Sequence, residues 1–378
     1  MARVAILVAT ALMLLAPGTA LAGWSVQESD QVDALVSRFL EPREGKAVPA
    51  ALSISLGVDG ELVLAKGFGQ ARQGTLATER TVYHIGSLTK QFTAAAMFKL
   101  IERGVPAPRS GKPLALETSA SDIFEGVDNW AGRGEPPITV RSLLTMTSNL
   151  PNFTRNPPPE ADPWGSVETP RLLAALKRQS PHGWPNTFEY SNTGYFLLAY
   201  MIEAALSASE GRRVSPRDFI RAELLRPAGL QRTGFIGDYA PGSELAEAHY
   251  RRRPAFAQPH WLDGCGDMAS NVVDLFAWHK GLMSGDVIGA ASREAMFSDA
   301  ARVDPLTYYG MGWFVGHEDD WNSYHHSGSV PGFTSYSAIL KHRRSGRWIS
   351  VTLLTNSDGV EGLDQLGDDI LSIVRDLP

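Results

Sequence analysis

The sequence contains little of what several common protein classes require. Its 378 residues include a single cysteine, Cys265, so no disulfide can form within the chain. Cys265 has no histidine or carboxylate at the spacing of a cysteine hydrolase, and we interpret it as a small buried hydrophobic residue. The formal net charge of −6 and the short, scattered basic runs argue against a nucleic-acid partner.

Motifs for metal, cofactor and phosphate binding are also missing. There is no His-Glu-x-x-His or His-x-His cluster of the kind that binds zinc. No glycine-rich loop has the spacing that holds a phosphate or a dinucleotide. Because there is no Gly-x-Ser-x-Gly elbow, an α/β-hydrolase fold would lack its nucleophile. We therefore expect neither a metal nor an organic cofactor.

Long apolar runs are confined to the first residues, MARVAILVATALMLLAPGTALAG. Arg3 precedes an apolar segment at 4–15, and the triplet Ala20-Leu21-Ala22 has the small residues of a cleavage site. The alternative is a membrane anchor, but Pro17-Gly18 breaks the run, which is shorter than the ~20 residues that a spanning helix needs. We expect residues 1–22 to be the signal peptide of a periplasmic or secreted protein, with no stable membrane span after cleavage.

Both ends of the remaining chain carry strand patterns, and the middle is mostly helical. Two short strands surround an Asp59-Gly60 turn, and the late stretches GMGWFVG, SYSAIL and WISVTLLTN alternate or run apolar. Helices are expected at 32–40, after Ser87, at 143–147, 193–206 and 215–225, and in the closing stretch LDQLGDDILSIVRDL. This pattern predicts one α/β unit, formed by 23–113 and 304–378, with a helical domain inserted at 114–303.

Ser87 and Lys90 stand three residues apart, just before the apolar stretch FTAAAMF. Residues at this spacing share a helix face, so the hydroxyl and the ammonium group are expected to be neighbours. A serine hydroxyl is a weak nucleophile until a base takes its proton, and burial favours the neutral, basic form of lysine. The alternative is a surface lysine behind a helix-capping serine. The apolar run instead predicts a buried helix. Lysine is rarely buried unless it is paired, so a buried Lys90 is expected to have a function.

Tyr190 and Asn192 precede a second apolar helix, in FEYSNTGYFLLAYMIE. A phenol close to an ammonium group can share proton transfer with a serine, and an asparagine amide can bind a substrate carbonyl or the lysine. The alternative is that Ser191 or Asn192 is an ordinary helix N-cap.

A third element, HHSGSVPGFTSYSAIL, places His326, Ser327 and Gly328 at the start of a strand. Glycine there lets a substrate backbone lie against the strand edge, and the amide of Ser329 could point at an oxyanion. His326 would add a donor or a positive charge, depending on pH. The alternative is a glycine-rich turn with an exposed histidine.

Together these elements resemble the serine β-lactamase and penicillin-binding protein superfamily, in the branch with class C β-lactamases, D-Ala-D-Ala carboxypeptidases and esterases. The stretches ITVRSLLTMTSNLPNF, LLRPAGLQRTGF and GDMASNVVDLFAW extend the resemblance over 50–356. The resemblance implies a β-lactamase/transpeptidase-like α/β (α+β) fold. In it, an antiparallel sheet carries helices on both sides, and the site lies in a cleft beside the helical domain.

The resemblance also implies roles for the matching residues. Ser87 would be the acylated nucleophile, and Lys90 and Tyr190 would share the general acid and base work. The substrate-binding positions would be Asn192, His326, Ser327, Gly328 and Ser329. The amides of Ser87 and Ser329 would form the oxyanion hole.

Two departures from the family pattern bear on the substrate. His326-Ser327-Gly328 stands where β-lactamases of this branch usually carry Lys-Thr-Gly, so a β-lactam carboxylate would be held more weakly at neutral pH. Met146-Thr147-Ser148-Asn149-Leu150 stands where relatives often read His-Thr-Ser-Gly-Leu. We therefore expect a serine hydrolase that acts on an ester or amide, of esterase or D-amino-acid peptidase type, with a small-molecule or peptide substrate. The alternatives are a class C β-lactamase and a non-catalytic relative that binds cell-wall peptides or a protein.

Overall fold

The computed structural model describes residues 24–42, 48–127, 130, 136–158, 169–182, 184, 186–240, 244–249 and 262–375. The expected signal peptide, 1–22, lies outside these ranges. Within them, no helix has both the length and the apolar character that crossing a membrane requires.

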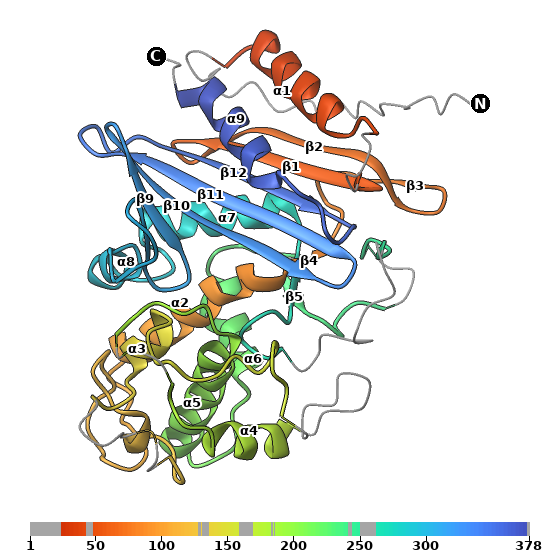
Figure 1. The fold of residues 1–378 in the computed structure, drawn as a ribbon. Coiled ribbons are helices and arrows are strands. Elements are labelled where there is room, and N and C mark those ends of the chain that lie inside the picture. The colour runs from red at the N-terminus through yellow and green to blue at the C-terminus, as the bar shows by residue number, and fades with distance from the viewer. Residues whose placement is uncertain are drawn as a thin grey trace.

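One antiparallel sheet carries strands from both ends of the chain (Figure 1). Its nine strands are, in sheet order, β3 (Thr75–Leu76), β2 (Glu61–Arg72), β1 (Ala51–Val58), β12 (Trp348–Thr355), β11 (Phe333–His342), β10 (Trp321–Val330), β9 (Phe314–Glu318), β8 (Thr307–Tyr309) and β7 (Ala301–Arg302). The central pairing of β1 with β12 joins the two ends of the chain. This arrangement confirms the predicted fold class.

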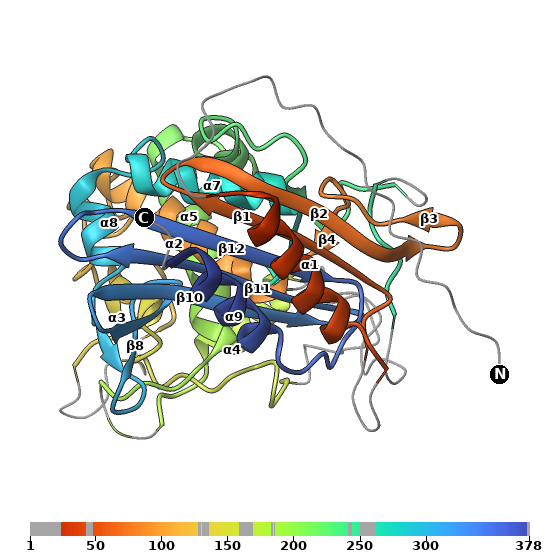
Figure 2. The ribbon, with the colours of Figure 1, turned by 90° about the horizontal axis from the view of Figure 1, so that it is seen from above.

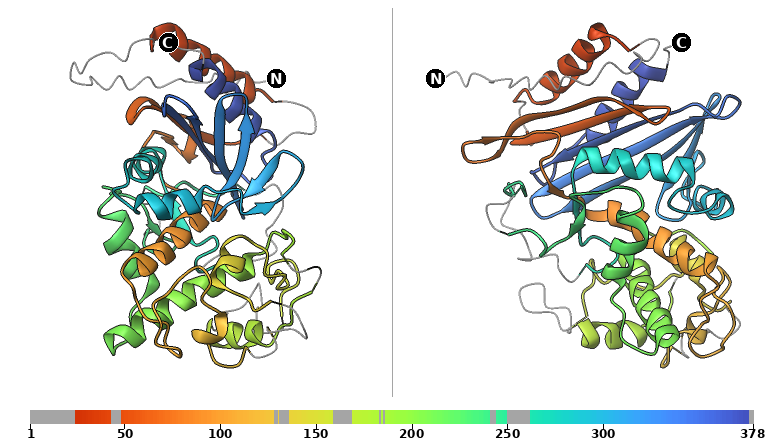
Figure 3. Two further views of the ribbon diagram at one scale, coloured as in Figure 1. Left: turned by 90° about the vertical axis from the view of Figure 1, so that its left-hand side faces the viewer. Right: turned by 180° about the vertical axis from the view of Figure 1, so that it is seen from behind.

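Helices cover both faces of the sheet. On one face lie α1 (Val26–Phe39) and α9 (Leu363–Arg375), side by side over the strands (Figure 2). The other face carries α7 (Val272–Ser284), which contacts β1 and β12 (Figure 3). The α1 helix begins six residues before the predicted start at residue 32, because Ser25 and Glu28 form a capping box that satisfies its first amides.

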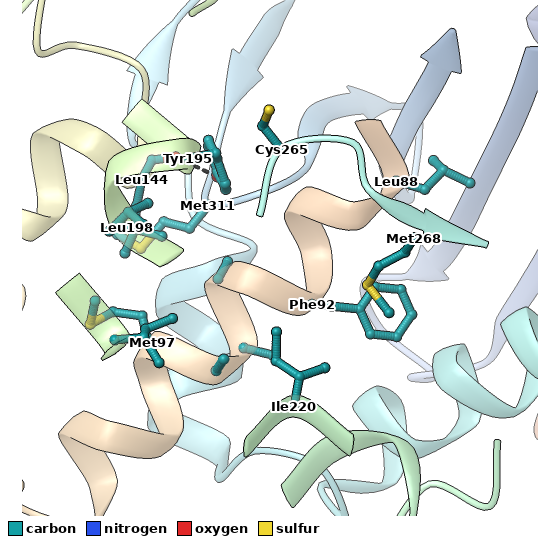
Figure 4. Packing of buried hydrophobic residues seen from close by; sticks show 14 of the residues in the cluster. Leu88, Phe92, Met97, Leu144, Tyr195, Leu198, Ile220, Cys265, Met268 and Met311 are labelled. Carbon is teal, nitrogen blue, oxygen red and sulfur yellow. Dashed lines mark hydrogen bonds between the residues drawn. The ribbon is translucent and has the colours of Figure 1, made fainter. Parts of the chain in front are cut away.

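Helix α2 (Thr89–Glu102) is central to the helical part of the molecule. This part also contains α3 (Val140–Leu144), α4 (Thr169–Lys177), α5 (Asn192–Glu210), α6 (Pro216–Ile220), a π-helical segment (Arg221–Leu225) and α8 (Ala290–Met296). Of these, α5, α6, the π-helical segment and α8 contact α2. Figure 4 shows buried side chains from several of these elements and from β6 (Met268–Ser270) around α2, as the apolar run in the sequence predicts. A small sheet of β4 (Tyr83–His84), β6 (Met268–Ser270) and β5 (Gly234–Phe235) links α2 to the rest.

Two predicted helices have different bounds in the structure. The helix expected at 143–147 ends at Leu144, because Met146 and Asn149 adopt left-handed backbone conformations, with φ of 58° and 54°. The helix expected at 215–225 changes from α to π geometry after Ile220. Because α7 packs on the sheet although it lies within 114–303, the division into domains at 113 and 303 stays a prediction.

Candidate active site

Ser87 lies in a short 3-10 turn, η1 (Gly86–Leu88), between β4 and α2. The turn is anchored on both sides. The amide of Ile85 donates to the Met268 carbonyl at 3.1 Å, and the Ser335 hydroxyl donates to the Ile85 carbonyl at 2.9 Å. The Ser87 side chain is half-buried, so its hydroxyl is held in place and is still open to a ligand.

Lys90 is fully buried on the first turn of α2, and its ammonium group is matched by three acceptors. It donates to Ser87 Oγ at 2.9 Å. Its other two bonds, both 2.7 Å long, go to Asn192 Oδ1 and to the Cys265 carbonyl. The Nζ atom also lies 5.1 Å from the centre of the Tyr190 ring. A buried charge is costly without partners, so this full set of acceptors fixes where the amine sits.

Tyr190 approaches the same serine from the loop that precedes α5. Its hydroxyl donates to Ser87 Oγ at 2.9 Å, so Lys90 and Tyr190 both contact the oxygen. Asn192 is the first residue of α5, but its side chain does not cap the helix. Its Nδ2 donates to Thr154 Oγ1 at 2.8 Å, and its Oδ1 faces Lys90. The structure thus brings four of the predicted site residues together, although they come from distant parts of the sequence.

The end of β10 presents an open edge beside Ser87. Strand β9 pairs with β10 only as far as His325, and no described strand pairs with that side of 326–330. A two-residue turn joins β10 to β11, so the backbones of Val330 and Phe333, which flank it, are hydrogen-bonded to each other. From this pair onward, hydrogen-bonded and non-hydrogen-bonded residue pairs alternate along the two strands. By this register, Ser327 and Ser329 direct their backbone groups to the open edge. Their side chains point to the sheet face opposite that of His326 and Gly328.

Two glycines let β10 lie directly against the η1 turn. A Cβ atom on Gly328 would lie 2.1 Å from the Ile85 carbonyl oxygen, and one on Gly86 would lie 2.9 Å from the Ser329 nitrogen. Gly86 also has a left-handed φ of 52°, which favours glycine. The amide of Ser329 therefore lies close to the turn that carries Ser87, which is the arrangement that an oxyanion hole from these two residues requires.

His326 is buried below this edge, with 1% of its surface exposed. Its Nδ1 is 2.6 Å from the Ser327 carbonyl, which can only accept, so Nδ1 carries the proton. The Tyr309 hydroxyl lies 3.3 Å from Nε2 and donates to it. Burial, and then the positive charge of Lys90, lower the pKa of His326 to about 3. The sequence predicted that His326 would supply either a hydrogen-bond donor or a positive charge. At neutral pH it is uncharged, so it does not supply the positive charge.

Aromatic rings surround His326 on the side of Tyr190. The centre of the Phe314 ring lies 5.3 Å from that of His326, and the Tyr190 ring lies at 6.0 Å. Phe188 contacts Phe314 at 6.2 Å and Tyr309 at 5.4 Å. Phe188 and Phe314 are both partly exposed, so they offer an uncharged, apolar surface near the hydroxyls of Tyr190 and Ser87.

Several contacts in the site were not predicted from the sequence. The Cys265 carbonyl that binds Lys90 is a backbone atom, which leaves no signal in residue type. Cys265 itself is 2% exposed, as expected of a small buried residue. Thr154 follows the loop segment TSNLPNF, and only its contact with Asn192 marks it as part of the site. In the described part of the chain, no three His, Cys, Asp or Glu side chains gather as a metal site would need.

Comparison with known proteins identifies the family. The family model described as Beta-lactamase matches residues 32–374. PbpX of Bacillus subtilis (strain 168) is 26% identical over 324 residues, which make up 84% of this chain and 73% of PbpX. An unguisins hydrolase of Aspergillus campestris is 26% identical over 309 residues, 75% of this chain and 55% of that protein. The chain thus spans between about half and three quarters of these two relatives.

Solved structures share the fold at lower sequence identity. An octameric penicillin-binding protein homologue from Pyrococcus abyssi has a TM-score of 0.74 at 24% identity, covering 92% of this chain and 77% of that one. D-amino acid amidase from Ochrobactrum anthropi has a TM-score of 0.72 at 20% identity, with coverages of 92% and 99%. The hydrolase EstCE1 also has a TM-score of 0.72, at 17% identity, with coverages of 93% and 100%. Since the family match extends over nearly all of the 378 residues, the chain belongs to the Beta-lactamase family of serine hydrolases.

Proposed function

We propose that the protein hydrolyses an ester or an amide through an acyl-enzyme on Ser87. The observation that carries the proposal is the contact of Ser87 Oγ with two proton-transfer groups, Lys90 Nζ and Tyr190 Oη, each at 2.9 Å. A nucleophile within hydrogen-bond distance of a base that is itself held by further partners is the signature of covalent catalysis.

The proposed reaction has two balanced halves. When the Lys90–Tyr190 pair lacks one proton, Ser87 Oγ attacks the carbonyl carbon and passes its proton to that pair, and the amides of Ser87 and Ser329 bind the developing oxyanion. The bond to the leaving group then breaks, and the leaving oxygen or nitrogen takes up that proton. Water next gives a proton to the same pair and attacks the carbonyl carbon of the acyl-enzyme, and this proton returns to Ser87 Oγ as the acid is released.

The surroundings of His326 favour a leaving group without a carboxylate. The general acid must lie beside the leaving atom, so the leaving group lies on the side of Tyr190. On that side the rings of Phe188 and Phe314 are partly exposed, and the buried His326 next to Phe314 is neutral. We therefore place esterase or amidase activity ahead of β-lactamase or D-Ala-D-Ala carboxypeptidase activity, whose substrates carry a carboxylate. The amidase and the hydrolase EstCE1 among the structural neighbours support this choice.

We also propose that the protein works in the periplasm or outside the cell. The proposal rests on the charged, apolar and small-residue pattern of residues 1–22. Intact mass of protein recovered from a periplasmic fraction tests it. A mass that matches a chain starting at Gly23 is expected, and an uncleaved chain retained in the cytoplasm would contradict it.

A matched substrate panel tests the hydrolase proposal. Purified mature protein is given p-nitrophenyl acyl esters, D-amino-acid amides, a D-Ala-D-Ala peptide and a β-lactam. We expect turnover of the esters or amides and, in quenched samples, a protein mass increased by the acyl group. If none of these substrates is turned over and no acylated protein forms, the non-catalytic alternative takes the place of the proposal.

Replacing Tyr190 with phenylalanine is expected to lower kcat/KM for an amide by ~10²–10³-fold, because the leaving nitrogen needs a proton. The fall is expected to be smaller for a p-nitrophenyl ester with the same acyl group, since p-nitrophenolate leaves without one. The ratio of the two kcat/KM values is the measurement. Equal losses on both substrates would assign Tyr190 to the attack step alone.

Replacing His326 with lysine is expected to shift selectivity toward carboxylate-bearing leaving groups. The measurement is the ratio of kcat/KM for two peptides that differ only in a C-terminal carboxylate or carboxamide. A charge-assisted bond to the carboxylate is worth ~1.5–3 kcal/mol, so the ratio should rise ~10-fold or more. His326→Gln, which stays neutral, is the control and should leave the ratio unchanged. A wild-type preference for the carboxylate peptide would contradict the proposed leaving-group class.

A further inference from the structure

The turn at residues 262–266 supplies the third acceptor of Lys90. The amides of Cys265 and Gly266 both donate to the Leu262 carbonyl at 2.9 Å, which makes the turn tight. Its Cys265 carbonyl accepts from Lys90, and its Gly264 carbonyl accepts from Thr93 Oγ1, at 2.7 Å in each case. The turn is therefore bonded at two points along one face of α2, and its position sets that of the lysine amine.

A partly buried ion cluster holds the residues that flank this turn. Arg217, on α6, donates from Nη2 to Asp263 Oδ1 at 2.5 Å and lies 3.0 Å from Asp267 Oδ2. Asp267 Oδ1 accepts from the Gly264 amide at 3.1 Å, and Tyr200 donates its hydroxyl to Asp263. One guanidinium thus joins the residues on both sides of Gly264 and Cys265.

The cluster depends on the charge of Arg217. The side chain of Asp267 is 1% exposed. Burial, and then the negative charge of Asp263, raise the pKa of Asp267 to about 7, against the opposing effect of Arg217. Without the guanidinium, the pKa of Asp267 would rise further, so its carboxyl group would take up a proton and both carboxyl groups would lose their ion pairs with Arg217. The turn between them would then lose the bonds that hold it.

We propose that Arg217, Asp263 and Asp267 form a positioning cluster for the catalytic lysine. None of them contacts Ser87. They act through the Cys265 carbonyl, which keeps Lys90 Nζ directed at Ser87 Oγ. This inference rests on the proposed acyl-enzyme mechanism. The position of Lys90 affects the rate of acylation, because a displacement of ~1 Å at a reacting group can lower a reaction rate ~10²-fold.

A cavity next to the cluster makes the proposal testable by chemical rescue. A space of about 440 Å³ is lined by Arg217, Asp263 and Asp267 together with apolar side chains of α5 and α6. The Arg217 side chain is 33% exposed, so solutes can reach its place when it is truncated. In Arg217→Ala, a free guanidinium ion can occupy the vacated position between the two carboxylates.

The test measures how fast a fluorophosphonate labels Ser87, together with kcat and KM for a substrate. In Arg217→Ala we expect the labelling rate and kcat to fall ~10–10²-fold with KM little changed, and millimolar guanidinium to restore most of both. Sodium chloride at equal ionic strength should restore neither. Asp267→Asn, which keeps the shape and the acceptor for Gly264, should lower both rates and should not respond to guanidinium.

Arg213→Ala is the matched control. Arg213 lines the same cavity, but it pairs with Glu203 at the surface, with 84% of its side chain exposed, so its loss should leave both rates at the wild-type level. Wild-type rates in Arg217→Ala and Asp267→Asn, or a loss in Arg217→Ala that guanidinium does not reverse, would overturn the positioning role. Failure of the wild-type protein to label would instead count against the proposed hydrolase function.

Discussion

Replacement of Ser87 by alanine is expected to lower kcat/KM by about 10⁴-fold or more on every substrate that the wild-type protein hydrolyses. The change removes the oxygen atom that both Lys90 and Tyr190 contact, so no acyl-enzyme can form and the two remaining groups have nothing to activate. The measurements are steady-state kinetics and the intact mass after fluorophosphonate treatment. We expect an adduct on the wild-type protein and none on the variant.

The fold should survive this change. Ser87 is small and half-buried, and a water molecule can replace its hydroxyl as the acceptor for Lys90, so the melting temperature should stay close to that of the wild type. Ser329→Ala is a matched control, because its exposed side chain is not used and its backbone amide is kept. Full activity in Ser87→Ala would remove the acyl-enzyme mechanism. A large loss in Ser329→Ala would show that its side chain, not its amide, matters.

Replacement of Lys90 by methionine is expected to lower kcat/KM by about 10²–10⁴-fold, the contribution of a positioned general base. Methionine has a similar length and suits a buried position, so the loss should be one of proton transfer rather than of folding. The measurements are kcat/KM and the rate of fluorophosphonate labelling, both of which depend on activation of Ser87.

This variant should also change the titration of His326. Lys90 is one of the groups that lower the pKa of His326, so the pKa should rise above about 3 when the positive charge is removed. Histidine resonances followed by NMR across an acid titration measure this. Lys99→Met is the control on the same helix, since Lys99 is partly exposed and pairs with Glu102 rather than with a residue of the site. An active Lys90→Met variant would assign the base role to Tyr190 alone.

Much of the fold was predictable from the sequence because its signals are local. The apolar stretch after Lys90 predicted a buried helix, and every residue of α2 from Thr89 to Phe98 is buried. The Asp59-Gly60 turn predicted the β1–β2 hairpin, and both of these residues have positive φ angles. The early end of α3 was missed, because the residue type of Met146 does not show that its backbone is left-handed, and the signal at Asn149 is only a preference. Asn149 stands where relatives often carry glycine, and asparagine is among the residues that best tolerate this conformation.

The part of the candidate site that consists of side chains was predictable from the sequence. Ser87, Lys90, Tyr190 and Asn192 could be proposed from their types and spacing, and the structure brings them into contact. Their roles stay predictions until variants are measured. The Cys265 carbonyl and the open edge of β10 could not be proposed in this way, because a backbone atom and a missing neighbour depend on tertiary arrangement alone. The neutral state of His326 could not be proposed either, since it follows from burial and from Lys90, 236 residues earlier in the numbering.

The place of β12 between β1 and β11 determines when the protein can become active during its synthesis. Ala51 bonds through its amide to Asn356, 305 residues further along, so the sheet closes only after nearly the whole chain has been made. Until then the β1–β2 hairpin has an unpaired edge, and such edges promote aggregation. The β10–β11 hairpin, which carries the Ser329 amide, would likewise lack its β12 support. A nascent or C-terminally truncated chain would thus contain Ser87 and Lys90 and still lack a working site.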